Sequence, residues 1–126
     1  MSKSNQLLHL HRGNFKQVIE SHSLVIVDFW AEWCQPCVDF FPVLTEVAEK
    51  YPHLLFAELN VDTSADVATF FNVKKIPALL VIRDQIVIDA VQGWMTADEL
   101  IQSLSVWEAY EVSTISNHFD EKSLRI

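Results

Sequence analysis

Apolar residues recur along the chain with two different periods, and the alternation of these periods predicts the order of the secondary-structure elements. Runs that are continuously or alternately apolar predict strands, over residues 7–10, 24–30, 54–61, 78–82 and 86–91. Apolar residues at helical spacing predict helices, over residues 15–19, 37–51, 67–71 and 97–107. The order β-α-β-α-β-α-β-β-α predicts a three-layer α/β/α domain with a central mixed sheet. We expect strands separated by helices to run parallel and the closing hairpin to add an antiparallel pair.

Proline and small polar residues predict how these elements begin, bend and end. Pro42 lies inside the pattern of the long helix and predicts a kink rather than two separate helices. Asn14 and residues 62–64 offer capping side chains for the two short helices, and Thr96 opens a segment with the form of a capping box. Three polar residues, 83–85, join the last two apolar runs and predict a hairpin.

The composition limits the class of protein. With 126 residues, half of them hydrophobic, the chain is long enough for one domain with a real core. Its 17 acidic and 9 basic residues give a net charge of −8, which argues against nucleic acid or an anionic membrane as a partner. No apolar run approaches the roughly 18 residues of a membrane helix, and the N-terminal segment lacks a signal-peptide core. We therefore expect a cytoplasmic protein.

Helical periodicity fades from about Ala109, and this change predicts where the domain ends. We expect one domain over residues 1–108 and a C-terminal extension over residues 109–126, which is polar with scattered apolar residues. The extension could be disordered, dock on the domain or recruit a partner. The sequence leaves these three options open.

The only two cysteines, Cys34 and Cys37, lie three positions apart, where the buried strand over residues 24–30 gives way to the long helix. In a reducing compartment, a lone pair of this kind is more often catalytic or metal-binding than a structural staple. At a strand-to-helix turn the pair favours disulfide chemistry. Two alternatives stay open: a passive reduced pair, and half of a zinc site, which would need two further ligands.

The residues around this pair resemble the thioredoxin family. The resemblance covers roughly residues 5–107 and rests on Val27-Asp28-Phe29-Trp30-Ala31-Glu32-Trp33-Cys34, Pro42, Leu59-Asn60-Val61-Asp62, Ile76-Pro77 and Gly93. It implies the thioredoxin fold and a thiol–disulfide oxidoreductase that acts on disulfide-bearing proteins as a monomer. It also implies electrons from NADPH through a flavoprotein thioredoxin reductase, with a redox-active Cys34–Cys37 disulfide and neither a bound cofactor nor a metal.

The environment of each cysteine suggests its role, because the thiolate is the nucleophile of disulfide exchange. Cys34 stands at the expected start of the helix, where free N–H groups and the helix dipole favour a negative charge, so we assign it as the attacking thiol. Cys37, one turn further on and facing the core, is then the resolving thiol. Asp28 is the candidate proton acceptor for Cys37 if burial raises its pKa. The alternative is an aspartate that faces solvent at the strand end.

The family resemblance also implies a docking surface for an extended substrate segment. Pro77 matches the family's cis-proline opposite the cysteines, where the backbone of Ile76 would pair with the substrate. The alternative is an ordinary trans proline in a turn. Trp33, Gly93 and Trp94 would complete an apolar rim around the site. Trp94 has no obvious counterpart in the family, and partial burial against the last helix would also explain it.

Three residues depart from the family's pattern. Gln35 and Pro36, between the cysteines, tune the relative stability of the two redox forms, and Gln35 replaces the usual glycine. Glu58 stands where lysine is common, and a second carboxylate there predicts a still higher pKa for Asp28. Ala78 replaces the threonine that usually follows the loop proline.

Two classes of function follow from these residues, and the reductase is the one we favour. The intact cysteine pair, Asp28 and Pro77 support it. A specialised client-binding or chaperone-type module, with incidental redox turnover, is favoured by Gln35, Glu58 and the extension. A third possibility keeps the chemistry but reverses its direction, giving an oxidant or isomerase, which the missing signal peptide disfavours. The five histidines show no ligand spacing and are expected at the surface.

Overall fold

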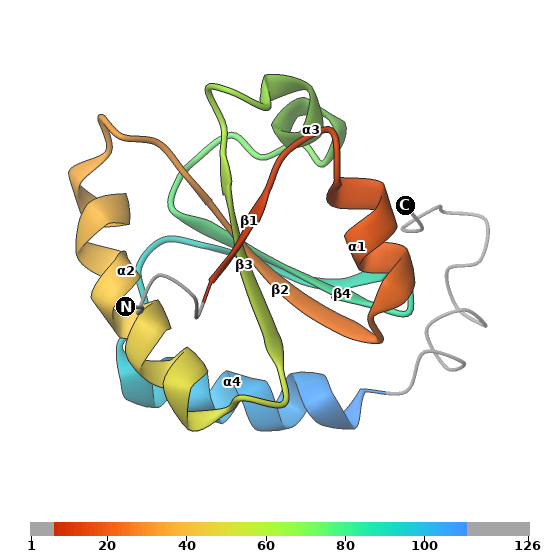
Figure 1. The fold of residues 1–126 in the computed structure, drawn as a ribbon. Coiled ribbons are helices and arrows are strands. Elements are labelled where there is room, and N and C mark those ends of the chain that lie inside the picture. The colour runs from red at the N-terminus through yellow and green to blue at the C-terminus, as the bar shows by residue number, and fades with distance from the viewer. Residues whose placement is uncertain (1–6, 111–126) are drawn as a thin grey trace.

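The computed structural model describes residues 7–110, and Figure 1 shows them as a coloured ribbon. The predicted order of elements is confirmed, with these bounds: β1 (Leu8–Leu10), α1 (Phe15–Ser21), β2 (Leu24–Trp30), α2 (Gln35–Lys50), β3 (Leu55–Asn60), α3 (Ala65–Phe70), β4 (Ala78–Arg83), β5 (Ile86–Gln92) and α4 (Ala97–Ala109). The boundary predicted at residue 108 falls within the last turn of α4. All but the start of the expected extension lies outside the described residues, so its role stays a prediction.

The five strands form one mixed sheet in the order β1-β3-β2-β4-β5. β2 lies at the centre of the sheet, and six of its seven residues are buried, which explains why its sequence is almost continuously apolar. β1, β3 and β2 run parallel, whereas β4 runs antiparallel to β2 and β5 antiparallel to β4. The mixed sheet is confirmed, but the direction of β4 is not the predicted one.

β4 was expected to run parallel because a helix precedes it, and this prediction is wrong. The connection that contains α3 starts where β3 ends, at Asn60, and returns to the same edge of the sheet instead of crossing to the far edge. The chain therefore enters β4 from the edge at which β2 ends, and Ala78 pairs with Phe29. This reversal brings the loop before β4 beside the end of β2, where the cysteines follow.

Two hydrophobic clusters cover the two faces of the sheet and make the three predicted layers. On one face α1 and α3 pack on the odd-numbered residues of β2, from Val25 to Phe29. On the other face α2 and α4 pack on Leu24 and Ile26, with the ring of Trp107 buried among them. Figure 1 shows these helices arranged around the twisted sheet.

The ends of the elements agree with the sequence at some positions and differ at others. α2 runs through Pro42 as one helix, and Thr96 caps α4 in a reciprocal capping box, as predicted. The capping predicted at the two short helices is wrong, because Asn14 accepts a hydrogen bond from the backbone of His11 and Ser64 accepts one from that of Arg12. Both side chains therefore tie the loop after β1 in place instead of capping a helix.

The hairpin between β4 and β5 turns on two residues rather than the three predicted. Asp84 and Gln85 both adopt positive φ angles, of 49° and 70°. This is the backbone that two-residue hairpins require, since it matches the twist of the flanking strands. Within residues 7–110, no helix is long and apolar enough to cross a membrane, and no three potential metal-ligating side chains gather together.

Candidate active site

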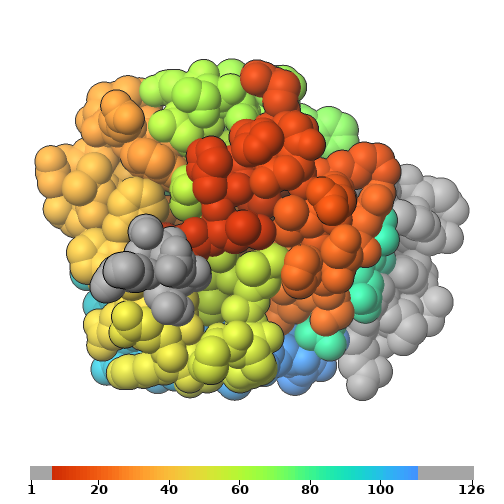
Figure 2. All heavy atoms as spheres, in the orientation of Figure 1, coloured from red at the N-terminus to blue at the C-terminus, as the bar shows by residue number. Residues whose placement is uncertain are grey.

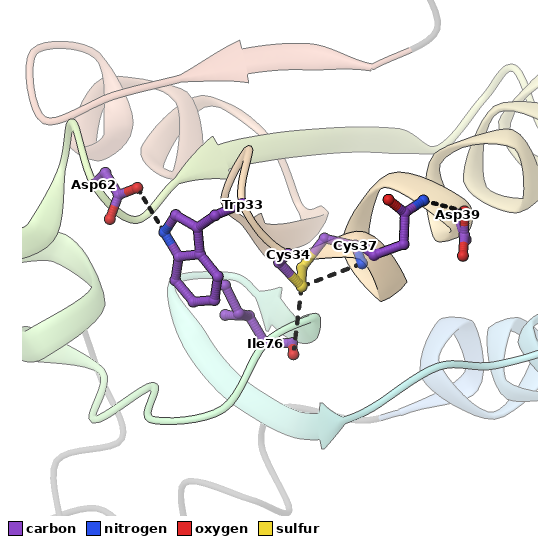
Figure 3. The surroundings of a disulfide bond; sticks show 7 residues. Trp33, Cys34, Cys37, Asp39, Asp62 and Ile76 are labelled. Carbon is purple, nitrogen blue, oxygen red and sulfur yellow. Dashed lines mark hydrogen bonds between the residues drawn. A yellow bond between two sulfur atoms is a disulfide. The ribbon is translucent and has the colours of Figure 1, made fainter.

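The turn from β2 into α2 places the two cysteines at the start of a helix. Cys34 is the N-cap of α2, and Pro36 occupies the first turn, where a missing N–H leaves no helical hydrogen bond unmade. The backbone N–H of Cys37 donates to Sγ of Cys34 over 3.2 Å (Figure 3). An N–H and the positive end of the helix dipole therefore both point at Cys34 Sγ, which favours a negative charge on that sulfur.

The two cysteines are joined as a disulfide, with their Cα atoms 5.3 Å apart. Cys34 is 5% exposed and Cys37 is completely buried. Ala31 packs with both, and Trp30, Val61 and Ile76 surround them. An incoming molecule can therefore approach Cys34, whereas Cys37 is reached only from within the protein.

The loop before β4 lies against the disulfide. The peptide bond between Ile76 and Pro77 is cis, as the family resemblance implies. The carbonyl oxygen of Ile76 lies 3.8 Å from Sγ of Cys34, and Figure 3 shows it facing the sulfur from the opposite side of the site. Pro77 in turn accepts a hydrogen bond of 2.8 Å from the N–H of Gly93. The loop and the segment after β5 are thus fixed to each other beside the cysteines.

Trp33, Gly93 and Trp94 lie around this site with different degrees of exposure. Trp33 is 71% exposed, and its indole donates to Oδ2 of Asp62 over 2.9 Å, which holds the ring near the cysteines (Figure 3). Gly93 has a φ of +98°, a conformation that other residues rarely adopt. Trp94 is half-exposed, and its ring centroid lies 6.4 Å from that of Phe40. Trp94 therefore packs in part against Phe40 of α2. Its predicted role in client docking, and the alternative of partial burial against the last helix, both stay predictions.

Asp28 is buried, so the alternative of a solvent-facing aspartate is wrong. It is 1% exposed, and neither of its carboxylate oxygens has a hydrogen-bond partner among the described residues. Burial raises the pKa of Asp28 well above its ordinary value of 3.8, and the negative charge of Glu58 raises it further. Asp28 shares the face of β2 that packs on α2, so it is a buried carboxyl group whose protonated form is favoured by its surroundings.

Glu58 lies beside Asp28 on the neighbouring strand and is held by two donors. The two residues are paired in the parallel register of β2 and β3. One oxygen of Glu58 accepts from the indole of Trp30 over 2.6 Å, and the other lies 2.8 Å from Nδ1 of His9. Glu58 therefore remains oriented beside Asp28, where its negative charge disfavours the ionised form of Asp28.

The side chain of Gln35 is directed along the helix. Its amide donates to Oδ1 of Asp39, one turn further on, over 2.8 Å. Gln35 therefore influences the cysteines through the first turn of α2 rather than by a hydrogen bond to sulfur. Its predicted role in tuning the redox forms stays a prediction, as does that of Pro36.

Sequence reasoning missed the partners that hold these residues. His9 was taken only as one of five surface histidines, and its side chain is indeed 61% exposed, yet it binds Glu58. Asp62 and Trp30 were quoted for the family resemblance without their roles as hydrogen-bond partners. The strand order would have revealed the contact of His9. β3 lies between β1 and β2, and this order places His9, Glu58 and Asp28 in one row across the sheet.

The fold and the cysteine pair define a class of protein: a thiol–disulfide oxidoreductase built on the thioredoxin fold. The thioredoxin family model matches residues 6–106 of the chain. The chain therefore belongs to the thioredoxin family, and its activity is the reduction of protein disulfides by dithiol–disulfide exchange.

Individual relatives agree with this assignment. Thioredoxin of Buchnera aphidicola subsp. Baizongia pistaciae is 34% identical over 106 residues, covering 82% of this chain and 97% of that protein. Putative thioredoxin 2 of Streptomyces coelicolor is 36% identical over 86 residues, covering 68% of this chain and 64% of that protein. Among solved structures, a mutant thioredoxin from Halobacterium salinarum superposes with a TM-score of 0.77 over 88% of this chain and 98% of its own, at 23% identity, which concerns the fold alone.

Proposed function

We propose that Cys34 is the attacking thiol and Cys37 the resolving thiol in the reduction of protein disulfides. The observation that carries this division is the hydrogen bond from the backbone N–H of Cys37 to Sγ of Cys34. A donor aimed at sulfur favours its thiolate, and the thiolate is the nucleophile of disulfide exchange. The complete burial of Cys37 leaves Cys34 as the sulfur that a protein disulfide can reach.

The reaction proceeds through two exchanges that balance without a cofactor. The thiolate of Cys34 attacks one sulfur of the client disulfide, so a bond forms between them and the other client sulfur leaves as a thiolate. Cys37 loses its proton and attacks Cys34, which forms the Cys34–Cys37 disulfide and releases the second client thiolate. The two client thiolates take up protons. The client disulfide is reduced by two electrons, and the dithiol of the protein is oxidised.

Asp28 accepts the proton of Cys37 in this proposal. A general base acts best when its pKa lies near the working pH, and burial raises the pKa of Asp28 in that direction. The side chain is on the face of the sheet against which α2 packs. The proton then leaves Asp28 before the next cycle.

The client segment docks in extended form along the backbone of Ile76, beside the cis Pro77, with Trp33 and Trp94 as apolar walls. The carbonyl of Ile76 lies next to Cys34 and is available to accept a main-chain hydrogen bond. Exposed aromatic rings bury large areas on binding, which suits a protein client. The hydrogen bond from the N–H of Gly93 to the carbonyl of Pro77 fixes the segment that carries Trp94 beside the loop.

Electrons return to the protein from NADPH in this proposal. A flavoprotein thioredoxin reductase carries them to the Cys34–Cys37 disulfide, and the protein works as a monomer in the cytoplasm. A reducing compartment suits a dithiol that must be regenerated after each cycle. Oxidation of NADPH that requires both proteins, and a monomer mass in solution, are the measurements that test these points.

Alkylation of the reduced protein tests the assignment of the two thiols. Iodoacetamide should modify Cys34 first, at least about 10-fold faster than Cys37, because only Cys34 is both accessible and stabilised as a thiolate. Mass spectrometry of peptides after short reaction times gives the ratio. Equal labelling, or faster labelling of Cys37, would reverse the assignment.

Replacing Glu58 with lysine should move the activity–pH profile to lower pH. The change removes a carboxylate beside Asp28 and adds a cation, and both effects favour the ionised form of Asp28. A shift of about one pH unit in the acid limb is the expected size, since close charge pairs commonly shift a pKa by that much. Glu58→Gln, which keeps an acceptor for Trp30, is the control and should shift the limb about half as far. An unmoved profile in both variants means that the two carboxylates are not coupled.

A further inference from the structure

A row of three titratable side chains crosses the sheet and joins the protein surface to the buried Asp28. His9 on β1 and Asp28 on β2 are both register partners of Glu58 on β3, so the three side chains share one face. Their exposure falls along the row, from His9 at 61% through Glu58 at 16% to Asp28, which is buried. β1 is an edge strand, and its segment lies open on the face of the molecule shown in red in Figure 2.

The middle member of the row is fixed from both sides. Trp30 donates to Oε1 of Glu58, and Nδ1 of His9 lies 2.8 Å from Oε2, so the carboxylate cannot turn away from Asp28 without losing two partners. The ring of Trp30 is itself packed edge-on against Phe41 of α2. The distance from His9 to Asp28 is thus bridged by one oriented carboxylate.

We propose that His9 is a positioning residue for the reaction: it holds Glu58 in place, and its charge sets how strongly Glu58 repels the carboxylate of Asp28. The inference rests on the proposed role of Asp28 as proton acceptor. An imidazole carries a positive charge only when it is protonated. Protonated His9 offsets the charge of Glu58 and favours ionised Asp28, whereas neutral His9 leaves Glu58 unopposed and favours protonated Asp28.

The other elements packed against this row supply few charges. Among the described residues, the buried side chains of α2 and α4 in the core on this face are apolar, and the charged residues of α2 are exposed. Asp89 on β5 bonds the indole of Trp107, and burial and Glu58 are the causes that raise the pKa of Asp28. On β1, the ring of His11 lies 5.6 Å from that of His9. Among the described residues, His9 is therefore the side chain in contact with Glu58 that can carry a positive charge.

The test follows Asp28 and the reaction separately. In the oxidised protein, the carboxyl carbon NMR resonance of Asp28 is followed against pH and gives the midpoint at which Asp28 loses its proton. In the reduced protein, single-turnover reduction of a protein disulfide gives the reaction rate at each pH. His9→Lys, a permanent cation, should lower the midpoint by about half a pH unit or more, whereas His9→Gln, which cannot be protonated, should not lower it. Below the midpoint, half a unit corresponds to about a threefold change in rate, faster for His9→Lys.

The control is a second exposed histidine–glutamate pair. His53→Gln removes the imidazole that lies 3.1 Å from Glu108 on α4, outside the row, and should move neither the midpoint nor the rate profile. In a Glu58→Gln background, His9→Lys should lose most of its effect, because the carboxylate that holds the cation in the row is gone. A purely structural role of His9 would change the stability of the protein and leave the midpoint of Asp28 where it is. A shifted midpoint therefore distinguishes the proposed role from a structural one.

Two results would overturn the proposal. An Asp28 midpoint that ignores both His9 variants, while responding to Glu58→Gln, would remove His9 from the coupling. A midpoint that moves without any change in the rate profile would remove His9 from the reaction. If Asp28→Asn also retains the normal profile, the assignment of Asp28 itself has failed, which separates that failure from one confined to His9.

Discussion

Cys37→Ser should arrest the reaction at the mixed disulfide and leave the client protein covalently attached to Cys34. The serine cannot attack Cys34, so the second exchange depends on an external thiol. Intramolecular attack by a well-placed group corresponds to a very high effective concentration, and its loss should lower turnover by about 1,000-fold or more. A client of known mass, incubated with the reduced variant, should give one stable adduct in non-reducing mass spectrometry, which dithiothreitol releases.

Cys34→Ser is the matched control for this experiment. The buried thiol of Cys37 should capture no client, because the side chain is completely inaccessible. A variant protein without either cysteine gives the background. Adducts of equal yield from the two single variants, or an adduct formed only by Cys34→Ser, would contradict the order of attack and resolution.

Asp28→Asn should slow the release of the client at neutral pH and remove the acid limb of the activity–pH profile. An amide cannot accept the proton of Cys37, and loss of general base catalysis commonly costs about 100-fold or more in rate. The first exchange, at Cys34, should be almost unchanged. Stopped-flow measurement of the two exchanges separates these effects, and equal slowing of both would argue against the assigned role of Asp28.

The same substitution should stabilise the folded protein increasingly as the pH rises. The pKa of Asp28 is raised by folding, so the folded state holds a proton that the unfolded state has released. Above the unfolded value, the free energy of unfolding of the wild type therefore falls by about 1.4 kcal/mol per pH unit until the folded pKa is passed. Asp28→Asn lacks this loss. Urea unfolding of both oxidised proteins between about pH 5 and 9 gives the difference.

Asp98→Asn is the control for the stability measurement. Asp98 is an exposed aspartate in the first turn of α4, and its replacement should cost only a few tenths of a kcal/mol at any pH in this range. A difference for Asp28→Asn that stays constant with pH would mean that burial does not hold the proton on Asp28.

Local pattern predicted the elements of this fold because the apolar periods are strong. The β-branched and aromatic run of β2 is buried on both faces, and the helical spacing of α2 places its apolar side chains in the core, as expected. The helix caps predicted at Asn14 and Ser64 are absent, because each side chain accepts a hydrogen bond from the loop after β1 instead of from its own helix. Asn14 accepts from the N–H of His11 and Ser64 from that of Arg12. For Asn14 a competing local hydrogen bond won over the cap, and for Ser64 a contact with a residue distant in sequence did.

The direction of β4 could not be read from the order of elements alone. A helix between strands usually returns the chain for a parallel strand, but the connection that contains α3 begins and ends at the same edge of the sheet. The consequence is large, since the reversal is what puts Ile76 next to Cys34. The short α1 connects two parallel strands, so helix length alone does not predict the direction of the next strand.

The sequence predicted the site residues that belong to recognisable motifs. It did not predict the contacts that depend on how the strands pair. The cysteines, Asp28 and Pro77 stand out along the chain, and Glu58 was recognised as an unusual neighbour of Asp28. The contact of His9 with Glu58 depends on β1 pairing with β3, which joins two residues 49 positions apart. Only the strand order reveals that an exposed histidine at the edge of the sheet reaches toward the buried carboxylate.

The most direct test of the central claim is the rate at which the protein reduces insulin disulfides with NADPH and a thioredoxin reductase, compared between the wild type and Cys34→Ser. We predict rapid oxidation of NADPH by the wild type and a rate at background for the variant. Turnover that survives the substitution would contradict the assignment of Cys34. Negligible turnover by the wild type, with a dithiol that still equilibrates with glutathione, would contradict the general reductase and favour the specialised client-binding module.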